Sequence, residues 1–135
     1  MVFTNGCFDV IHVGHIRLLK KAASFGPLTV GLNSDGSMRQ IKREPINPVG
    51  NRCIILLAIK YVDSVIIFSE QTPQRLIEEL RPKVLVKGAD WPKHKIAGAE
   101  FVESYGGRVI RVPYSLGFST TKTIGKINAQ KEVVT

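Results

Sequence analysis

The chain opens with MVFTNGCFDVIHVGH, residues 1–15, and continues with apolar side chains that recur at helical spacing. Residues 1–5 form a short apolar run typical of a strand, and residues 13–25 have the periodicity of an amphipathic helix. The segment between them is polar and contains glycine and histidine. In an open parallel sheet, the residues that follow a strand and begin a helix face the ligand. The opening stretch therefore predicts a strand, a binding loop and a helix.

The rest of the chain repeats this alternation. Four apolar runs have the length and content of strands: residues 28–33, 64–68, 83–87 and 108–112. Four segments have helical patterns: residues 51–60, 73–80, 97–105 and 120–130. We interpret Asn33–Gly36 as a turn and residues 38–50, which are rich in charge and proline, as a loop. The alternation predicts a single α/β domain over residues 1–135, with a Rossmann-like, doubly wound sheet of about five parallel strands and helices on both faces.

Composition narrows the class of protein. The 135 residues are 44% hydrophobic and 22% charged, as in soluble globular domains, and the longest uncharged apolar run is too short to cross a bilayer. The start of the chain has no signal-peptide pattern, and the two cysteines form no CxxC pair, so we expect reduced thiols in a cytoplasmic protein. The net charge of +8 favours an anionic partner. Because the basic residues are scattered, we expect neither a nucleic acid nor a membrane as that partner.

Two histidines three positions apart open the first predicted helix. His12 and His15 share a helix face there, and Gly14 between them leaves room for a close ligand. A helix N-terminus adds unpaired N–H groups and a partial positive charge, which suits a phosphate. The alternative is that one histidine caps the helix and the other fills the core. Two histidines without a third ligand do not make a metal site, so none is expected.

A second cluster of hydroxyl groups precedes the last predicted helix. Ser119, Thr120 and Thr121 can bind phosphate oxygens together with the helix N–H groups, although a simple helix cap is an open alternative. Two such helix N-termini facing one crevice would suit a triphosphate.

Weaker candidates follow the other predicted strands. Lys42 and Arg52 flank a proline-containing loop that could position a cation, or that could be a solvated basic loop. Asp90 and Trp91 come just after a strand, where a carboxylate and an indole could hold a sugar and a base. Trp91 could equally belong to the core or to an interface, and Asp35 has the same open status.

These motifs together resemble the HxGH-containing nucleotidyltransferases, the cytidylyltransferase-like superfamily, and most closely its branch that acts on D-glycero-β-D-manno-heptose 1-phosphate. The resemblance covers nearly the whole chain. The segments that carry it are Phe3–Asp9, His12–His15, Asn33–Asp35, Ile46–Pro48 with Arg52, Thr72-Pro73, Leu85–Asp90 and Gly117–Thr121.

The resemblance implies that an acceptor phosphate attacks the α-phosphorus of ATP in line, giving an ADP-sugar and pyrophosphate without a covalent enzyme intermediate. It implies catalytic roles for His12, His15 and Lys42. The residues that it implies for nucleotide and phosphate binding are Thr4, Asn5, Gly6, Cys7, Phe8, Gly14, Gly88, Ser119, Thr120 and Thr121. Those that it places around the acceptor are Asp9, Asp35, Arg52, Asp90 and Trp91. It further implies Mg²⁺ carried by the triphosphate, and a homodimer.

Departures from the branch keep two other functions open. The stretch Lys42–Asn47 is shorter than expected, and Trp91 stands where tyrosine is usual, in a pattern similar to that of glycerol-3-phosphate cytidylyltransferases. A CTP-dependent enzyme acting on glycerol 3-phosphate or a similar alcohol phosphate is therefore one alternative. Tyr114-Ser115 replaces the Arg-Thr pair of that relative, which favours ATP. The other alternative, suggested by the charge of +8, is a non-catalytic module that binds nucleotides or nucleic acid.

Overall fold

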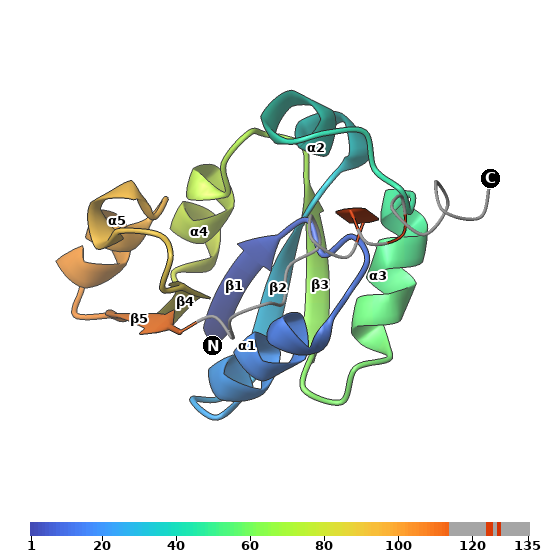
Figure 1. Cartoon of the computed structure of the whole chain (residues 1–135). Helices are drawn as coiled ribbons and strands as arrows, with labels where there is room; N and C mark the ends of the chain where they lie inside the picture. The colour runs from blue at the N-terminus through green and yellow to red at the C-terminus, as the bar shows by residue number, and fades with distance from the viewer. Residues whose placement is uncertain (114–123, 126, 128–135) are drawn as a thin grey trace.

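The computed structural model describes residues 1–113, 124–125 and 127 of the chain. Its five strands are parallel and lie in the order β3-β2-β1-β4-β5 (Figure 1). The strands are β1 (Val2–Gly6), β2 (Leu28–Asn33), β3 (Ser64–Phe68), β4 (Val84–Gly88) and β5 (Arg108–Val112). The helices are α1 (Val13–Ala23), α2 (Asp35–Ile41), α3 (Val49–Leu57), α4 (Gln74–Leu80) and α5 (Ala99–Ser104), with a short 3₁₀ helix η1 (Lys93–Lys95). The predicted doubly wound α/β fold is confirmed.

One hydrophobic core covers each face of this sheet. On one face, Leu18 and Leu19 of α1 and Leu56 of α3 pack with Val30 and other strand residues. On the opposite face, Phe3 and Leu85 pack against the second pair of helices, with Ile77 from α4 and Val102 from α5. Alternate side chains of a strand point to opposite faces, which is why adjacent Val2 and Phe3 enter different cores. Helices therefore cover both faces, as the sequence predicts (Figure 1).

The two central strands part at their carboxyl ends. β1 pairs with β2 along its whole length, but with β4 only at Val2↔Val84 and Phe3↔Leu85. The chain turns to opposite sides of β1 to form β2 and β4, so this is the switch point of the strand order. Ligands of open α/β sheets bind in the crevice at such a point. The topology thus places the candidate site beyond the ends of β1 and β4.

The structure corrects one part of the expected layout. The interpretation of Asn33–Gly36 as a turn is wrong, because helix α2 begins at Asp35. The loop expected at residues 38–50 is confirmed only for residues 42–48, since α2 continues to Ile41 and α3 begins at Val49. Ser34 caps α2 through an Oγ atom that accepts the N–H of Ser37 at 3.1 Å. The same small polar residues that suggest a turn therefore start a helix. The expected helix at residues 120–130 lies largely outside the described residues.

Two expectations about class can be compared with the described residues. No helix within them is long and apolar enough to span a membrane. Cys7 and Cys53 are free thiols, both partly buried. The structure thus has no disulfide between the two cysteines of the sequence.

Candidate active site

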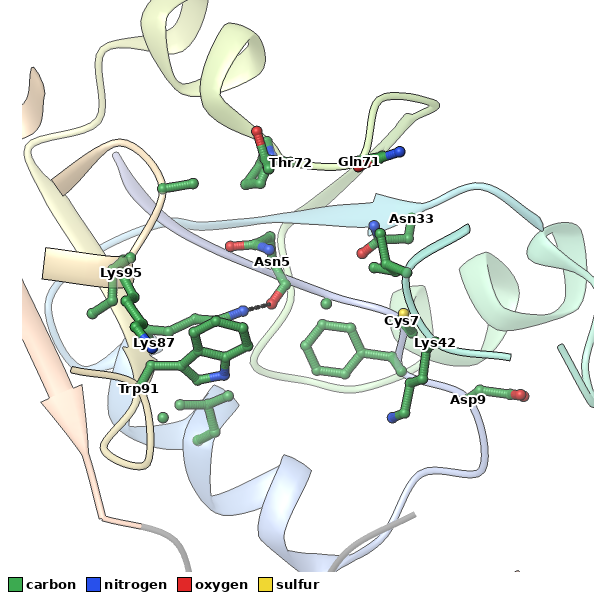
Figure 2. Close-up of a pocket in the computed structure, with 18 of the residues that line it drawn as sticks. Asn5, Cys7, Asp9, Asn33, Lys42, Gln71, Thr72, Lys87, Trp91 and Lys95 are labelled. Carbon is green, nitrogen blue, oxygen red and sulfur yellow. Dashed lines mark hydrogen bonds between the residues drawn. The ribbon is translucent and has the colours of Figure 1, made fainter. Parts of the chain in front are cut away.

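A cavity of about 500 Å³ opens at the carboxyl ends of β1 and β4. Residues 5–9, from the end of β1 and the loop that follows it, form its floor, with Lys42 on one side and Lys87 and Trp91 on the other (Figure 2). Thr72 and Pro73, which precede α4, contribute a further wall. The cavity therefore brings together segments that are far apart in the sequence.

The β1–α1 loop is held in an unusual backbone conformation. Phe8 has φ of 47° and Val10 has φ of 56°, a left-handed region that bulky and β-branched side chains rarely adopt. Gly6 lies against the Phe8 ring, where an added Cβ atom would come within 3.0 Å of Cε2. Such strain persists only where the surrounding structure imposes it, and it is common at ligand-binding loops. The loop thus has a fixed shape that aims residues 5–9 at the cavity.

His12 and His15 are locked together at the start of α1. Their rings stack with centroids 3.9 Å apart. The Nδ1 atom of His12 accepts the backbone N–H of Gly14 at 3.0 Å, and the Nδ1 atom of His15 accepts the backbone N–H of His12 at 3.1 Å. The alternative of a helix cap is therefore correct for His12, but His15 also lines the cavity. Capping and ligand binding are compatible roles for this pair.

The hydrogen bonds define the protonation of both rings. A neutral imidazole has one N–H group, so an Nδ1 atom that accepts a hydrogen bond leaves the proton on Nε2. Burial lowers the pKa of His12, and the nearby charge of Lys42 lowers it further. Burial, with the charges of His12 and Lys42, lowers the pKa of His15 to about 4. Near neutral pH, the pair therefore consists of neutral imidazoles that donate through Nε2.

The cavity carries a positive charge. Three lysines line its described walls, namely Lys42, Lys87 and Lys95, against one acidic residue, Asp9. The carboxylate of Asp9 already forms an ion pair with Arg43 at 2.8 Å, so it does not offset these lysines. An excess of cations in a partly enclosed space attracts anionic ligands. This arrangement fits a phosphate-bearing substrate.

Asp9 anchors the loop that carries Lys42. Its carboxylate accepts hydrogen bonds from Nη1 of Arg43 at 2.8 Å and from the backbone N–H groups of Ile46 at 2.8 Å and Asn47 at 3.0 Å. Although burial alone would raise the pKa of Asp9, these bonds hold it below its ordinary value. Asp9 borders the cavity, but its oxygen atoms are used to position residues 43–47.

Arg52 and Asp35 lie beneath the site. Arg52 is fully buried, and it donates to the backbone oxygens of Asn47, Cys7 and Asn33 and to Oδ1 of Asp35. Asp35 also accepts the backbone N–H of Val49 at 2.9 Å, which joins the starts of α2 and α3. Neither side chain lines the cavity. We therefore assign both to positioning the loops, in place of the contact with the acceptor that the sequence suggested.

Only some of the remaining predicted site residues line the cavity. Gly88 and the 45% exposed Trp91 line the cavity, whereas the exposed Asp90 does not. Thr4 is fully buried, and its hydroxyl donates to the backbone oxygen of Val86 at 2.8 Å, joining β1 to β4. Gly14 is buried within the helix start. The candidates Ser119, Thr120 and Thr121 lie outside the described residues.

Several cavity residues are not among the individual site residues predicted from the sequence, although Asn33 and Lys87 lie in segments that carry the family resemblance. Asn33, Gln71, Lys87 and Lys95 all contribute to the lining. Lys87 is the residue just before Gly88 at the end of a predicted strand, so its position next to the binding edge is a signal that could have identified it. Gln71 belongs to the connection after β3, where the sequence offers no comparable signal.

Comparison with known proteins defines the class of this site. A family model described as cytidylyltransferase-like matches residues 3–123. The chain belongs to this family, and the protein is an enzyme of the nucleotidyltransferase class. The family resemblance expected from the sequence motifs is confirmed.

Individual relatives refine the comparison. The chain is 54% identical over 130 residues to the bifunctional protein HldE of Geotalea uraniireducens, and 52% identical over 130 residues to that of Geobacter metallireducens. Each match covers 94% of this chain and 26% of the relative, so the chain spans about a quarter of the length of these curated relatives. A solved structure, the lipopolysaccharide core biosynthesis protein from Thermoplasma volcanium GSS1, aligns with a TM-score of 0.68 and 29% identity over 84% of this chain and 94% of that one.

Proposed function

We propose that the protein transfers the adenylyl group of ATP to a sugar 1-phosphate of the heptose type, giving an ADP-sugar and pyrophosphate. The observation that carries the proposal is the stacked pair His12–His15, which adjoins a cavity lined by lysines. The HldE relatives match over nearly the whole chain, and the sequence motifs resemble the heptose 1-phosphate branch. Both support this acceptor and this nucleotide.

The chemistry requires charge stabilisation more than a protein nucleophile. An oxygen of the acceptor phosphate forms a bond to the α-phosphorus, the bond to the bridging oxygen breaks, and pyrophosphate leaves with its electron pair. Negative charge increases on the oxygen atoms around phosphorus in the transition state. Nε2–H donors of His12 and His15 are suited to those oxygen atoms, as preorganised donors are in other enzymes. Lys42, whose charge reaches both imidazoles, supplies a cation on the same side.

Magnesium is proposed to enter with the nucleotide. The described residues include no group of three His, Cys, Asp or Glu side chains that could hold a metal ion. Mg²⁺ bound to triphosphate oxygens and water needs no such cage, so the donor set is compatible with a nucleotide-borne ion. When bound, it neutralises part of the charge on the leaving phosphates. By the family resemblance, Ser119, Thr120 and Thr121 are proposed to bind the β- and γ-phosphates.

Pyrophosphate release tests the proposal. Purified protein with magnesium is given each nucleoside triphosphate in combination with heptose 1-phosphate, other sugar 1-phosphates and glycerol 3-phosphate. ATP with heptose 1-phosphate is expected to give the highest kcat/KM. A preference for CTP with glycerol 3-phosphate would replace the proposal by the cytidylyltransferase alternative, and no release from any pair would contradict both.

The remaining expectations are proposals of the same kind. We propose a cytoplasmic homodimer that binds ATP and a phosphorylated sugar and does not bind nucleic acid. Binding to DNA or RNA with a steep dependence on salt concentration would contradict the last point, because phosphate contacts release counterions. Sedimentation measures the oligomeric state directly.

A further inference from the structure

Lys87 places an ammonium group in the cavity without a carboxylate ion-pair partner among the residues that the structure describes. The residue lies at the end of β4 and lines the cavity, and its Nζ atom donates to the backbone oxygen of Asn5 at 3.2 Å (Figure 2). None of the ion pairs formed within the described part of the chain includes Lys87. A buried charge is costly unless an opposite charge compensates it. The cavity is where such a charge could bind.

The groups around this ammonium do not neutralise it. Its Nζ atom lies 5.4 Å from the centre of the Trp91 ring, a contact that orients a cation but adds no negative charge. Asp90 is exposed and acts only from a distance, and the pKa of the Cys7 thiol is raised by burial, which favours its neutral form. A lysine has three donors, of which Asn5 uses one. The site is therefore able to accept an anion with several oxygen atoms.

Lys87 and Lys42 lie at opposite ends of the cavity. Figure 2 shows Lys87 and Trp91 on one side and Lys42 on the other, with Asn5 between them. The charge of Lys42 lowers the pKa values of both histidines, whereas that of Lys87 has no such effect. The neutral histidines and the cation of Lys42 thus form one end of the cavity, and the cation of Lys87 forms the other.

An in-line displacement needs protein groups that bind the nucleotide and the acceptor on opposite sides of the reacting phosphorus. The attacking oxygen and the leaving pyrophosphate lie on opposite sides of the α-phosphorus. Where the histidines and Lys42 bind the triphosphate, the acceptor must approach from the other side. We propose that Lys87 binds the acceptor's phosphate group and holds its attacking oxygen in line with the α-phosphorus. The inference rests on the proposed function. Burial lowers the pKa of Lys87, and an anion bound beside the ammonium group favours its protonated form.

Two matched lysine variants test this assignment by kinetics. Lys87→Met keeps the aliphatic chain and removes the charge, and Lys83→Met makes the same change at an exposed lysine near the opposite end of β4. Lys87→Met is expected to raise the KM for heptose 1-phosphate roughly tenfold to a hundredfold, the effect of losing a charge-assisted hydrogen bond, and to leave the KM for ATP unchanged. Lys83→Met should leave both unchanged. An unchanged acceptor KM, or an increase confined to ATP, would overturn the inference.

A measurement on the unmodified chain separates this inference from the proposed function. Lysines of the wild-type protein are methylated with formaldehyde and borohydride, with and without inorganic phosphate, and the sites are quantified by mass spectrometry. Phosphate is expected to slow modification of Lys87 and not of Lys83. Equal rates at Lys87 with and without phosphate would contradict its role. If no substrate pair releases pyrophosphate but Lys87 is protected, the proposed reaction fails and the phosphate site stands.

Discussion

The Nδ1 atom of His15 accepts the backbone N–H of His12, and the two rings stack with centroids 3.9 Å apart. The hydrogen bonds that cap α1 are thus the same ones that orient the imidazoles. Each ring uses Nδ1 for the helix and keeps its proton on Nε2. One helix start therefore fixes the orientation of both imidazoles, and His15 lines the cavity.

The tautomer of both histidines is the first prediction. At neutral pH, the rings of His12 and His15 are expected to be uncharged with the proton on Nε2, because their pKa values are lowered and both Nδ1 atoms accept hydrogen bonds. Nitrogen-15 chemical shifts of the ring atoms measure this. The exposed His94 provides a reference ring in the same spectrum. Imidazolium shifts, or protons on Nδ1, would contradict the assignment.

The low pKa of His15 predicts how stability depends on pH. Its pKa is about 4 in the folded chain against an ordinary 6.5, so the unfolded state binds the proton first as the pH falls. Stability should decrease as the pH falls from 6.5 towards 4, by up to about 3 kcal/mol from this residue, and should not respond to it above 6.5. Urea unfolding of the wild type and of His15→Asn measures the difference. Equal slopes for the two proteins in this range would be evidence against the shift.

The hydrogen bonds by which Asp9 holds residues 43–47 give a third prediction. Asp9→Asn removes the charge that Arg43 faces, and Nε and Nη2 of Arg43 are already buried without a hydrogen-bond partner. We expect a loss of about 2 kcal/mol in the free energy of unfolding and an increased KM for ATP, because Lys42 lies beside this anchor. Glu44→Gln, in an exposed ion pair with Arg39 on the same loop, should cost less than about 1 kcal/mol. Similar effects of both changes on stability would show that Asp9 has no special role.

The buried Arg52 gives a fourth prediction. Its guanidinium joins three backbone oxygens and Asp35 without any exposed surface. Arg52→Met should destabilise the fold by about 3 kcal/mol or more, because several polar groups lose their partner. Arg75→Met, which removes an exposed pair with Glu79 on α4, serves as the matched control and should change stability little. Denaturant unfolding distinguishes the two, and a small effect at Arg52 would argue for a direct role in substrate binding instead.

The fold was predictable because its strands are short apolar runs that alternate with segments of helical periodicity. The segments 28–33, 64–68 and 108–112 are strands in the structure at the predicted bounds. Helix α2 was not predictable in the same way, since Ser34, Asp35 and Gly36 are typical of turns and of helix starts alike. Its identity depends on tertiary contacts, such as the bond from Ser37 Oγ to the backbone oxygen of Glu70.

The site was predictable in its position but less so in the roles of its charges. The strand-end rule identifies the β1–α1 loop and His15, which the structure places at the cavity. Sequence does not reveal which charges pair with one another, so Asp9 and Arg52 look like ligand contacts although they hold protein groups. For Lys87 the difficulty is the opposite one, because the sequence of an apolar strand does not show that its lysine forms no ion pair within the described residues.

The most direct test measures pyrophosphate release from ATP and heptose 1-phosphate by the wild type and two variants of His15. His15→Asn keeps an oxygen that can accept the N–H of His12 but loses the Nε2 donor, whereas His15→Gln places an amide N–H near that donor position. We expect release by the wild type, a decrease in kcat of roughly 10²-fold for His15→Asn, and a smaller decrease for His15→Gln. A wild type without activity, or a His15→Asn variant with normal kcat, would contradict this expectation.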